Sequence, residues 1–99
     1  MNSIEQSRFA FSELSGVVAV ASHRSFRRAA AELGVSASAL SHAIASLEDR
    51  LDVRLFHRTT RSVSLSEAGT RFVERVRPAL GEIAGAMETV IIGATSRAR

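Results

Sequence analysis

The fold of this chain is decided by the stretch SFRRAAAELGVSASALSHAIASLEDRL, which runs from Ser25 to Leu51. It contains two short helical patterns separated by a break at residues 34–36. A serine precedes each pattern, Ser25 and then Ser36, and its hydroxyl can accept a hydrogen bond from a backbone N–H of the first helical turn. Gly34 is suited to the left-handed conformation that ends a helix. The stretch therefore predicts two helices joined by a tight turn, a helix-turn-helix.

The second of these helices has one apolar side and one side of small polar groups. Its leucines and isoleucine recur at intervals of four, three and four and share one stripe: Leu40, Ile44, Leu47 and Leu51. Ser38 and His42 project from the opposite side, with Ser41 on its flank. A surface without bulky groups can approach base edges closely, and serine and histidine supply donors and acceptors. The pattern favours a DNA recognition helix, and the alternative is an ordinary solvated helix face.

A further helical pattern precedes this stretch. Its apolar residues recur at helical spacing and predict one buried face: Phe11, Leu14, Val17, Val18 and Ala21. The helix that follows Ser25 has its own apolar face: Phe26, Ala29, Ala30 and Leu33. We expect Ser22-His23-Arg24 to end the first helix and the residues up to Arg8, which have no clear period, to form a loose arm.

Two strand candidates follow the helix-turn-helix. Val53–His57 is rich in strand-forming residues, and Ser62–Leu65 alternates polar and apolar residues with a period of two. The turn between them, Arg58-Thr59-Thr60-Arg61, is poorly suited to a core but well suited to phosphates or a minor groove. The alternative is that the arginines here are solvated or paired with nearby carboxylates: Glu48, Asp49 and Asp52.

The last helical pattern begins after Ser66, a candidate N-cap, and Glu67 lies where the helix dipole favours an anion. Its apolar residues alternate spacings of three and four and predict a dimerisation seam: Val73, Val76, Leu80, Ile83, Met87 and Val90. The alternative is that the stripe packs on its own domain, because residues 72–76 can reach the first helix. Pro78 lies opposite this seam, while Gly81 and Gly85 weaken the helix. We expect a linker helix over residues 66–92 and a frayed tail over residues 93–99.

Composition restricts the classes of protein that remain. Ninety-nine residues, 45% of them hydrophobic, suffice for one small domain, and the chain has no cysteine for a disulfide framework. It has neither an apolar run long enough for a membrane span nor a secretory signal pattern, so we expect a cytoplasmic protein. The net charge is +3, and residues 24–61 carry seven arginines against four acids. This local basic excess suits a polyphosphate partner.

The sequence offers no catalytic or metal-binding pattern. His23, His42 and His57 are widely separated, without a spacing that would bring them together as ligands. No serine is accompanied by a base and an orienting acid at motif spacing, and no glycine-rich phosphate loop is present. We therefore expect a binding protein without cofactor or metal, and not an enzyme.

From about Leu14 to Gly69, the chain resembles the N-terminal DNA-binding domain of a LysR-type transcriptional regulator. The resemblance is carried by the following residues: Ser25-Phe26, Arg28-Ala29-Ala30, Leu33, Val35-Ser36, Ala39-Leu40-Ser41, Ile44, Leu47-Glu48, Leu51, Val53-Arg54-Leu55-Phe56, Arg58-Thr59, Arg61, Val63, Leu65 and Glu67-Ala68-Gly69. It implies a winged helix-turn-helix that dimerises through a linker helix. It also implies a larger effector domain beyond that helix, and a small-molecule effector is expected only for that domain.

The chain departs from the family pattern at three places. Ala37-Ser38 stands where the family often has Gln-Pro, which removes a side-chain amide from the start of the recognition helix. Arg24 replaces a frequent glycine and can add a phosphate contact, and Val17 replaces a frequent phenylalanine in the core.

Together these observations predict a mainly α protein: a winged helix-turn-helix over residues 9–65, with the helix-turn-helix at about 25–51 and the wing at about 53–65, then the linker helix. We expect a dimer that binds an interrupted palindrome in double-stranded DNA. The alternative is a winged-helix module for protein interaction or dimerisation, without specific DNA binding. The candidate DNA-binding residues are Arg24, Ser25, Arg28, Ser36, Ala37, Ser38, Ser41, His42, Arg54, Arg58, Thr59, Thr60 and Arg61.

Overall fold

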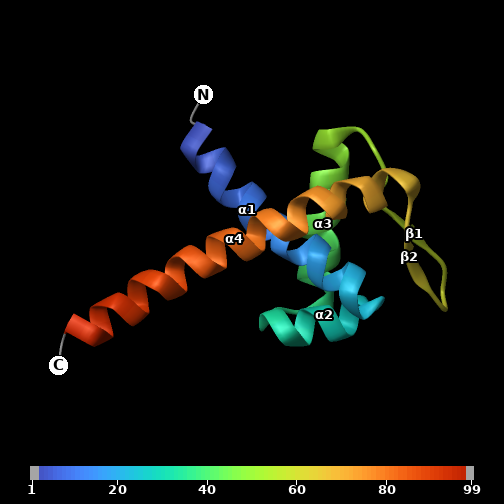
Figure 1. Cartoon of the computed structure of the whole chain (residues 1–99). Helices are drawn as coiled ribbons and strands as arrows, with labels where there is room; N and C mark the ends of the chain where they lie inside the picture. The colour runs from blue at the N-terminus through green and yellow to red at the C-terminus, as the bar shows by residue number, and fades with distance from the viewer. Residues whose placement is uncertain (1–2, 98–99) are drawn as a thin grey trace.

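Four helices and one β-hairpin make up the fold in the computed structural model, which describes the backbone of residues 3–97 and the side chains of residues 11–91 (Figure 1). In chain order the elements are α1 (Ser3–His23), α2 (Phe26–Leu33), α3 (Ala37–Leu51), β1 (Phe56–Arg58), β2 (Val63–Leu65) and α4 (Glu67–Arg97). The two strands pair antiparallel. The predicted architecture, a mainly helical domain with a hairpin and a long last helix, is confirmed.

The caps of the helix-turn-helix are those that the sequence predicts. The Ser25 hydroxyl oxygen accepts from the Arg28 backbone N–H at 3.1 Å. The Ser36 hydroxyl oxygen accepts from the Ala39 backbone N–H at 3.0 Å. Gly34 adopts a left-handed φ of 72° and so ends α2. These three residues fix the direction in which α3 leaves α2.

The core lies where α1, α2 and α3 meet, and the hairpin and the first turns of α4 close it. Its largest fully buried side chains are Val17, Val20, Ile44 and Leu55. Val17 has no exposed surface, although the family resemblance leads one to expect a larger residue there. The rest of the core consists of aliphatic residues and one aromatic ring: Ala19, Ala29, Ala30, Leu40, Leu47, Phe56 and Val73.

A buried carboxylate attaches the wing to α3. Glu48, only 5% exposed, accepts hydrogen bonds through Oε2 from the backbone N–H groups of Leu55 at 2.8 Å and Phe56 at 3.3 Å. The Leu55 N–H is bound to this side chain and the Val53 N–H to the Glu48 carbonyl at 3.1 Å, so the connection over residues 53–55 is not a strand. The pattern places the strand start at Val53, whereas β1 begins at Phe56.

The start of α4 is fixed to the same connection from the other side. Ser66 donates from its hydroxyl to the Arg54 carbonyl at 2.6 Å and from its backbone N–H to the Leu55 carbonyl at 2.8 Å. Its oxygen also accepts from the Gly69 N–H at 2.9 Å, which confirms Ser66 as a cap. Wing and linker helix therefore share one set of backbone anchors.

Helix α4 is uninterrupted from Glu67 to Arg97 despite Pro78 and the two glycines. It crosses α1, where the Arg77 guanidinium donates to the Ser22 hydroxyl at 3.2 Å, and its later turns project away from the rest of the fold (Figure 1). The structure extends this helix beyond residue 92, where the sequence pattern ends it. Residues 98 and 99 of the expected tail lie outside the described residues.

Several residues lie in other surroundings than their spacing predicts. Helix α1 already begins at Ser3, where we expected an arm. Val73 packs in the core of its own chain and not on an outer seam, as the alternative for residues 72–76 expects, because α4 starts against the hairpin and α1. Three residues assigned to buried faces are exposed by 37–42%, because they lie at the ends of their stripes: Phe11, Leu33 and Leu51.

The packing around Gly69 gives a first prediction. A β-carbon at this position would lie 2.0 Å from the Leu55 carbonyl oxygen, so α4 would have to move away from the connection. We expect Gly69→Ala to lower the free energy of unfolding by about 1–3 kcal/mol, measured by chemical denaturation. The control is Gly81→Ala, which has open space around it and should stabilise the helix by about 0.5–1 kcal/mol. Equal effects of the two substitutions would contradict the close contact.

Candidate nucleic-acid interface

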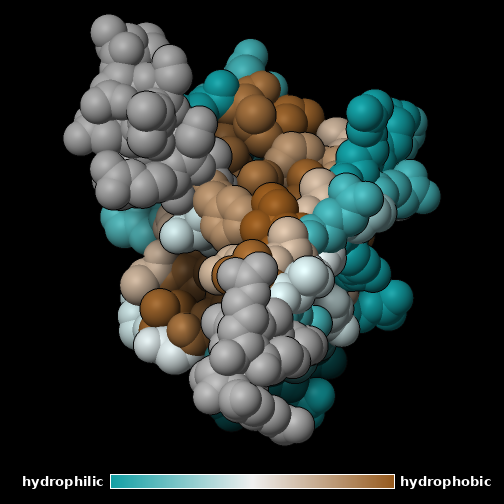
Figure 2. Space-filling model, turned by 60° about the vertical axis from the view of Figure 1, so that its left-hand side comes forward, coloured by the Kyte–Doolittle hydropathy of each residue, from teal (hydrophilic) through white to brown (hydrophobic). Residues whose placement is uncertain are grey.

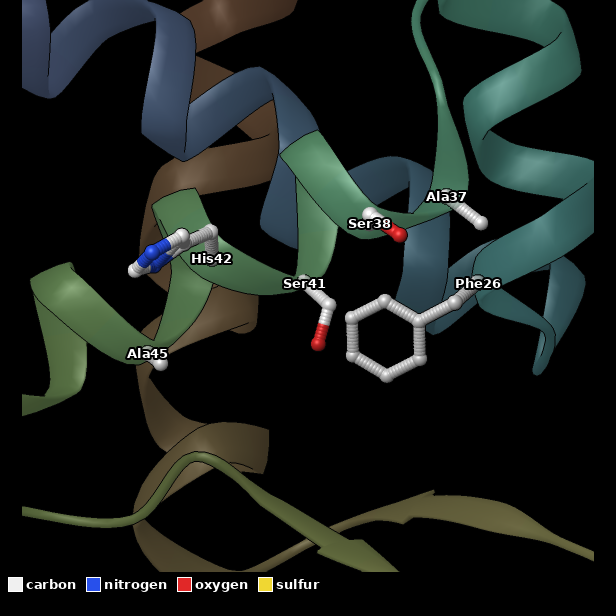
Figure 3. A pocket seen from close by; sticks show the side chains of 6 residues that line it. All are labelled: Phe26, Ala37, Ser38, Ser41, His42 and Ala45. Atoms are coloured by element: carbon white, nitrogen blue, oxygen red, sulfur yellow. The ribbon is translucent and has the colours of Figure 1, made fainter.

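A shallow hollow lies on the outer side of α3 (Figure 3). It is lined by residues of α3 and one aromatic ring from α2: Phe26, Ala37, Ser38, Ser41, His42 and Ala45. Every one of the α3 residues is small except His42, so backbone and hollow are both accessible from outside. The structure thus brings together four residues that the sequence predicts as a recognition surface, namely positions 37, 38, 41 and 42.

The polar side chains of this surface differ in whether they form hydrogen bonds within the protein. Ser38 and His42 are exposed, and in the part of the chain with described side chains neither has a side-chain hydrogen bond to protein. Ser41 is half-buried and accepts a hydrogen bond from Arg58 of the wing. Ser38 and His42 are therefore free to meet an external ligand, while Ser41 is already oriented.

The Arg58 side chain lies between the wing and the helix-turn-helix. Its Nη1 donates to the Ser41 Oγ at 2.9 Å, and its Nη2 lies 3.6 Å from the Glu48 Oε1. The guanidinium carbon is 4.3 Å from the centroid of the Phe26 ring, which itself packs edge-on against Phe56. The alternative that an arginine of the wing pairs with a neighbouring carboxylate is therefore realised at Arg58.

The other candidate arginines are exposed. Among the residues whose side chains are described, none of the following forms an ion pair within 4.0 Å: Arg24, Arg28, Arg54 and Arg61. Arg24 also has a positive φ of 53°, so the arginine adopts the left-handed conformation that suits the glycine frequent at this position. These side chains supply positive charge without an internal partner.

The wing tip is held by its own threonine. Thr59 Oγ1 accepts from the backbone N–H groups of Arg61 at 3.2 Å and Ser62 at 2.9 Å, so this hydroxyl shapes the turn. Thr60 and Arg61 are exposed. Of the two predicted threonine contacts, only Thr60 therefore has a hydroxyl that the turn does not use.

Two functional neighbours were not among the predicted site residues. The sequence pattern assigns Phe26 to the core and offers Glu48 only as a possible charge partner, yet both contact Arg58. Phe26 lies at the start of the helix-turn-helix and Arg58 lies beyond its end, so no local spacing could have paired them. A glutamate directly after a buried leucine on α3 was the only local signal for a buried carboxylate.

The described residues contain no group of three or more histidines and carboxylates placed to hold a metal ion. His23 instead pairs with Glu32, with 2.5 Å between His23 Nε2 and Glu32 Oε1. In the same part of the chain, no helix combines the length and apolar character needed to cross a membrane.

Residues 11–70 match the family model described as "Bacterial regulatory helix-turn-helix protein, lysR family", and the chain belongs to this family. A curated relative, the uncharacterized HTH-type transcriptional regulator YcaN of Escherichia coli (strain K12), is 57% identical over 76 residues, which are 77% of this chain and 25% of that protein. The chain thus spans about a quarter of the length of such relatives.

Solved structures show the same fold. The BenM_DBD complex with catB site 1 DNA has a TM-score of 0.75 at 28% identity and covers 80% of this chain and 88% of that one. Full-length CbnR complexed with its target DNA has a TM-score of 0.71 at 34% identity, over 80% of this chain and 27% of that one. The fold is therefore the winged helix-turn-helix of LysR-type regulators, as the sequence resemblance implies.

The role of Glu48 gives a second prediction. We expect Glu48→Gln to lower the free energy of unfolding by about 2 kcal/mol, because a buried charged acceptor of two backbone hydrogen bonds is replaced by a neutral amide. Thermal or chemical denaturation measures the change. Glu67→Gln is the matched control, since the Glu67 side chain is 86% exposed and pairs only with exposed Arg71. A loss of stability that is the same in both variants would contradict the anchoring role of Glu48.

Proposed function

We propose that this chain is the sequence-specific DNA-binding domain of a bacterial LysR-type transcription regulator. One observation carries the proposal: α3 presents an exposed face of small side chains, flanked by a wing whose Arg61 has no ion partner in the described part of the chain. Such a helix fits a major groove, and such a wing fits the phosphate backbone or the adjacent minor groove. The DNA complexes of similar folds support the same reading.

Base recognition is assigned to α3. Ser38 and His42 offer free donors and acceptors, and Ser41 lies beside them in the same hollow (Figure 3). Ala37 has no side-chain amide, so its contribution is close backbone approach and contact with the apolar parts of bases. The specificity of this domain therefore depends on few and short side chains.

Backbone binding is assigned to helix starts and arginines. Ser25 and Ser36 each satisfy one N–H of their helices, and the remaining free N–H groups of the first turns can bind phosphates. Arg54 and Arg61 extend this surface across the wing, together with Thr60. Arg24 and Arg28 add charge at the start of α2.

Dimerisation is assigned to the exposed part of α4. Val76 and Leu80 are half-buried, while Ile83, Met87 and Val90 are exposed by 42–71%. Figure 2 shows apolar surface, in brown, near the centre of the face that is turned toward the viewer. A second copy that covers this stripe would relate two α3 helices by a two-fold axis, and an interrupted palindrome is the matching DNA site.

In this role the domain binds DNA and needs neither a cofactor nor catalysis, and it acts in the cytoplasm, where the bacterial DNA lies. Response to a small molecule is assigned to the effector domain that the family resemblance implies. A second candidate function, a winged-helix protein-interaction module without specific DNA binding, is favoured by the short side chains of Ala37 and Ser38 and by a net charge of only +3.

Titration with duplex DNA at several salt concentrations distinguishes these functions. We expect the logarithm of the binding constant to fall with the logarithm of salt concentration, with a slope of several units, because phosphate contacts release counterions. The duplex is first selected from a random pool by the wild-type chain. A flat response, or selection that enriches no sequence, would favour the protein-interaction module.

Within this titration, Arg61→Ala should weaken binding to all duplexes alike and reduce the salt slope by about one unit, as expected for one lost phosphate contact. His42→Ala should instead change the preference among selected sites and leave the salt slope unchanged. If the two variants behaved identically, the separation of backbone and base contacts proposed here would be wrong.

The dimer is tested by analytical ultracentrifugation. Met87→Glu, which buries a charge in the proposed seam, should shift the chain toward monomer and weaken binding to the full palindrome. Thr89→Glu is the control, because Thr89 lies on the opposite side of α4 and is exposed. A dimer that persists in Met87→Glu at micromolar concentration would place the interface elsewhere.

A further inference from the structure

We propose that Arg58 is a positioning residue that commits the hydroxyl of Ser41 to act as a hydrogen-bond donor toward DNA. The inference rests on the proposed function and deepens it, because it assigns a specificity role to a wing residue that the sequence places among the phosphate contacts. Arg58 acts on the bases through Ser41, across the boundary between wing and recognition helix.

The hydrogen bond between the two residues has only one possible direction. A guanidinium has N–H donors and no acceptor, so Arg58 Nη1 donates and Ser41 Oγ accepts at 2.9 Å. The hydroxyl hydrogen of Ser41 must then point elsewhere. Among the described residues, no protein acceptor for it is found, although serines and threonines elsewhere in the helices, such as Ser15, donate to the carbonyl four residues earlier.

Two further contacts restrain the Arg58 side chain in this position. Glu48 Oε1 lies 3.6 Å from Nη2, and the ring of Phe26 lies under the guanidinium at 4.3 Å. The Arg58 side chain is 30% exposed. The planar face of its guanidinium contacts the ring, and its two terminal nitrogens face Ser41 and Glu48. An exposed arginine such as Arg61 has none of these restraints and is the better phosphate contact.

The consequence concerns which bases can lie opposite Ser41. An unrestrained serine hydroxyl can donate or accept and tolerates either kind of base edge. Arg58 occupies one of the two lone pairs of the Ser41 hydroxyl and turns its hydrogen away from the guanidinium. Ser41 then favours an acceptor in the major groove, such as purine N7, guanine O6 or thymine O4, over the amino group of cytosine or adenine. Arg58 of the wing thus restricts which base is bound opposite Ser41 without contacting that base itself.

A double-mutant cycle tests the coupling, with the full chain and a duplex selected by the wild type. Ser41→Ala, Arg58→Met and the double variant are measured at three salt concentrations. We expect each single variant to weaken binding about two- to tenfold. The double variant should be no weaker than the more affected single variant, and the salt slope of Arg58→Met should equal that of the wild type. Arg61→Met is the control, whose effect should multiply with that of Ser41→Ala and lower the slope.

A second selection measures specificity directly. Arg58→Met should relax the base preference at the same position of the site as Ser41→Ala does. Replacing a purine there by its 7-deaza analogue, when the selected base is a purine, should weaken the wild type and leave both variants unaffected. Relaxation at a different position would overturn the proposal.

Arg58→Lys keeps the charge and separates the two roles even if Arg58→Met fails to fold. A phosphate contact predicts near-wild-type binding for lysine, whereas the positioning role predicts the loss seen with Ser41→Ala, because an ammonium lacks the planar fork. A thermal-denaturation cycle of Ser41 and Arg58 without DNA reports the contact itself. Effects that multiply, with a lower salt slope for Arg58→Met, would overturn this inference alone, and a wild type that binds no duplex would overturn the proposed function as well.

Discussion

The structure depends on one buried carboxylate. Glu48 belongs to α3, yet its oxygens bind the backbone N–H groups at the entrance to the wing and face the guanidinium of Arg58. A charge that is 95% removed from solvent is tolerated only where donors surround it, and each of those donors comes from the wing. Recognition helix and hairpin, which an ordinary loop would leave free to move, are thereby held in one relative orientation.

The sequence was sufficient for the parts of the fold that follow from local rules. Ser25, Gly34 and Ser36 determine the helix ends through side-chain and left-handed caps, and a stripe of leucines determines which side of α3 is buried. The long last helix followed from its spacing, although Val73 is covered by its own chain because the contact between α4 and α1 is not local. The hydrophobic spacing of a helix indicates which of its sides is buried, but not which part of the protein covers that side.

In the candidate site, too, local features could be predicted from the sequence and non-local contacts could not. The exposed surface of Ser38 and His42 could be predicted, because exposure opposite an apolar stripe is a property of one helix. The surroundings of Arg58 could not, since they join residues from α2, α3 and β1 that are brought together only by folding. The sequence does not distinguish an arginine of the hairpin that points outward, such as Arg61, from one that points inward, such as Arg58.

The fusion of α4 to the wing has a mechanical consequence. Ser66 clamps the first turn of this helix to the Arg54–Leu55 backbone, and Gly69 leaves no gap between them. A helix of 31 residues is a lever of roughly 46 Å. A rotation at the far end of α4 is therefore transmitted to α3 and the wing, and in the proposed dimer such a rotation would change the angle between the two α3 helices.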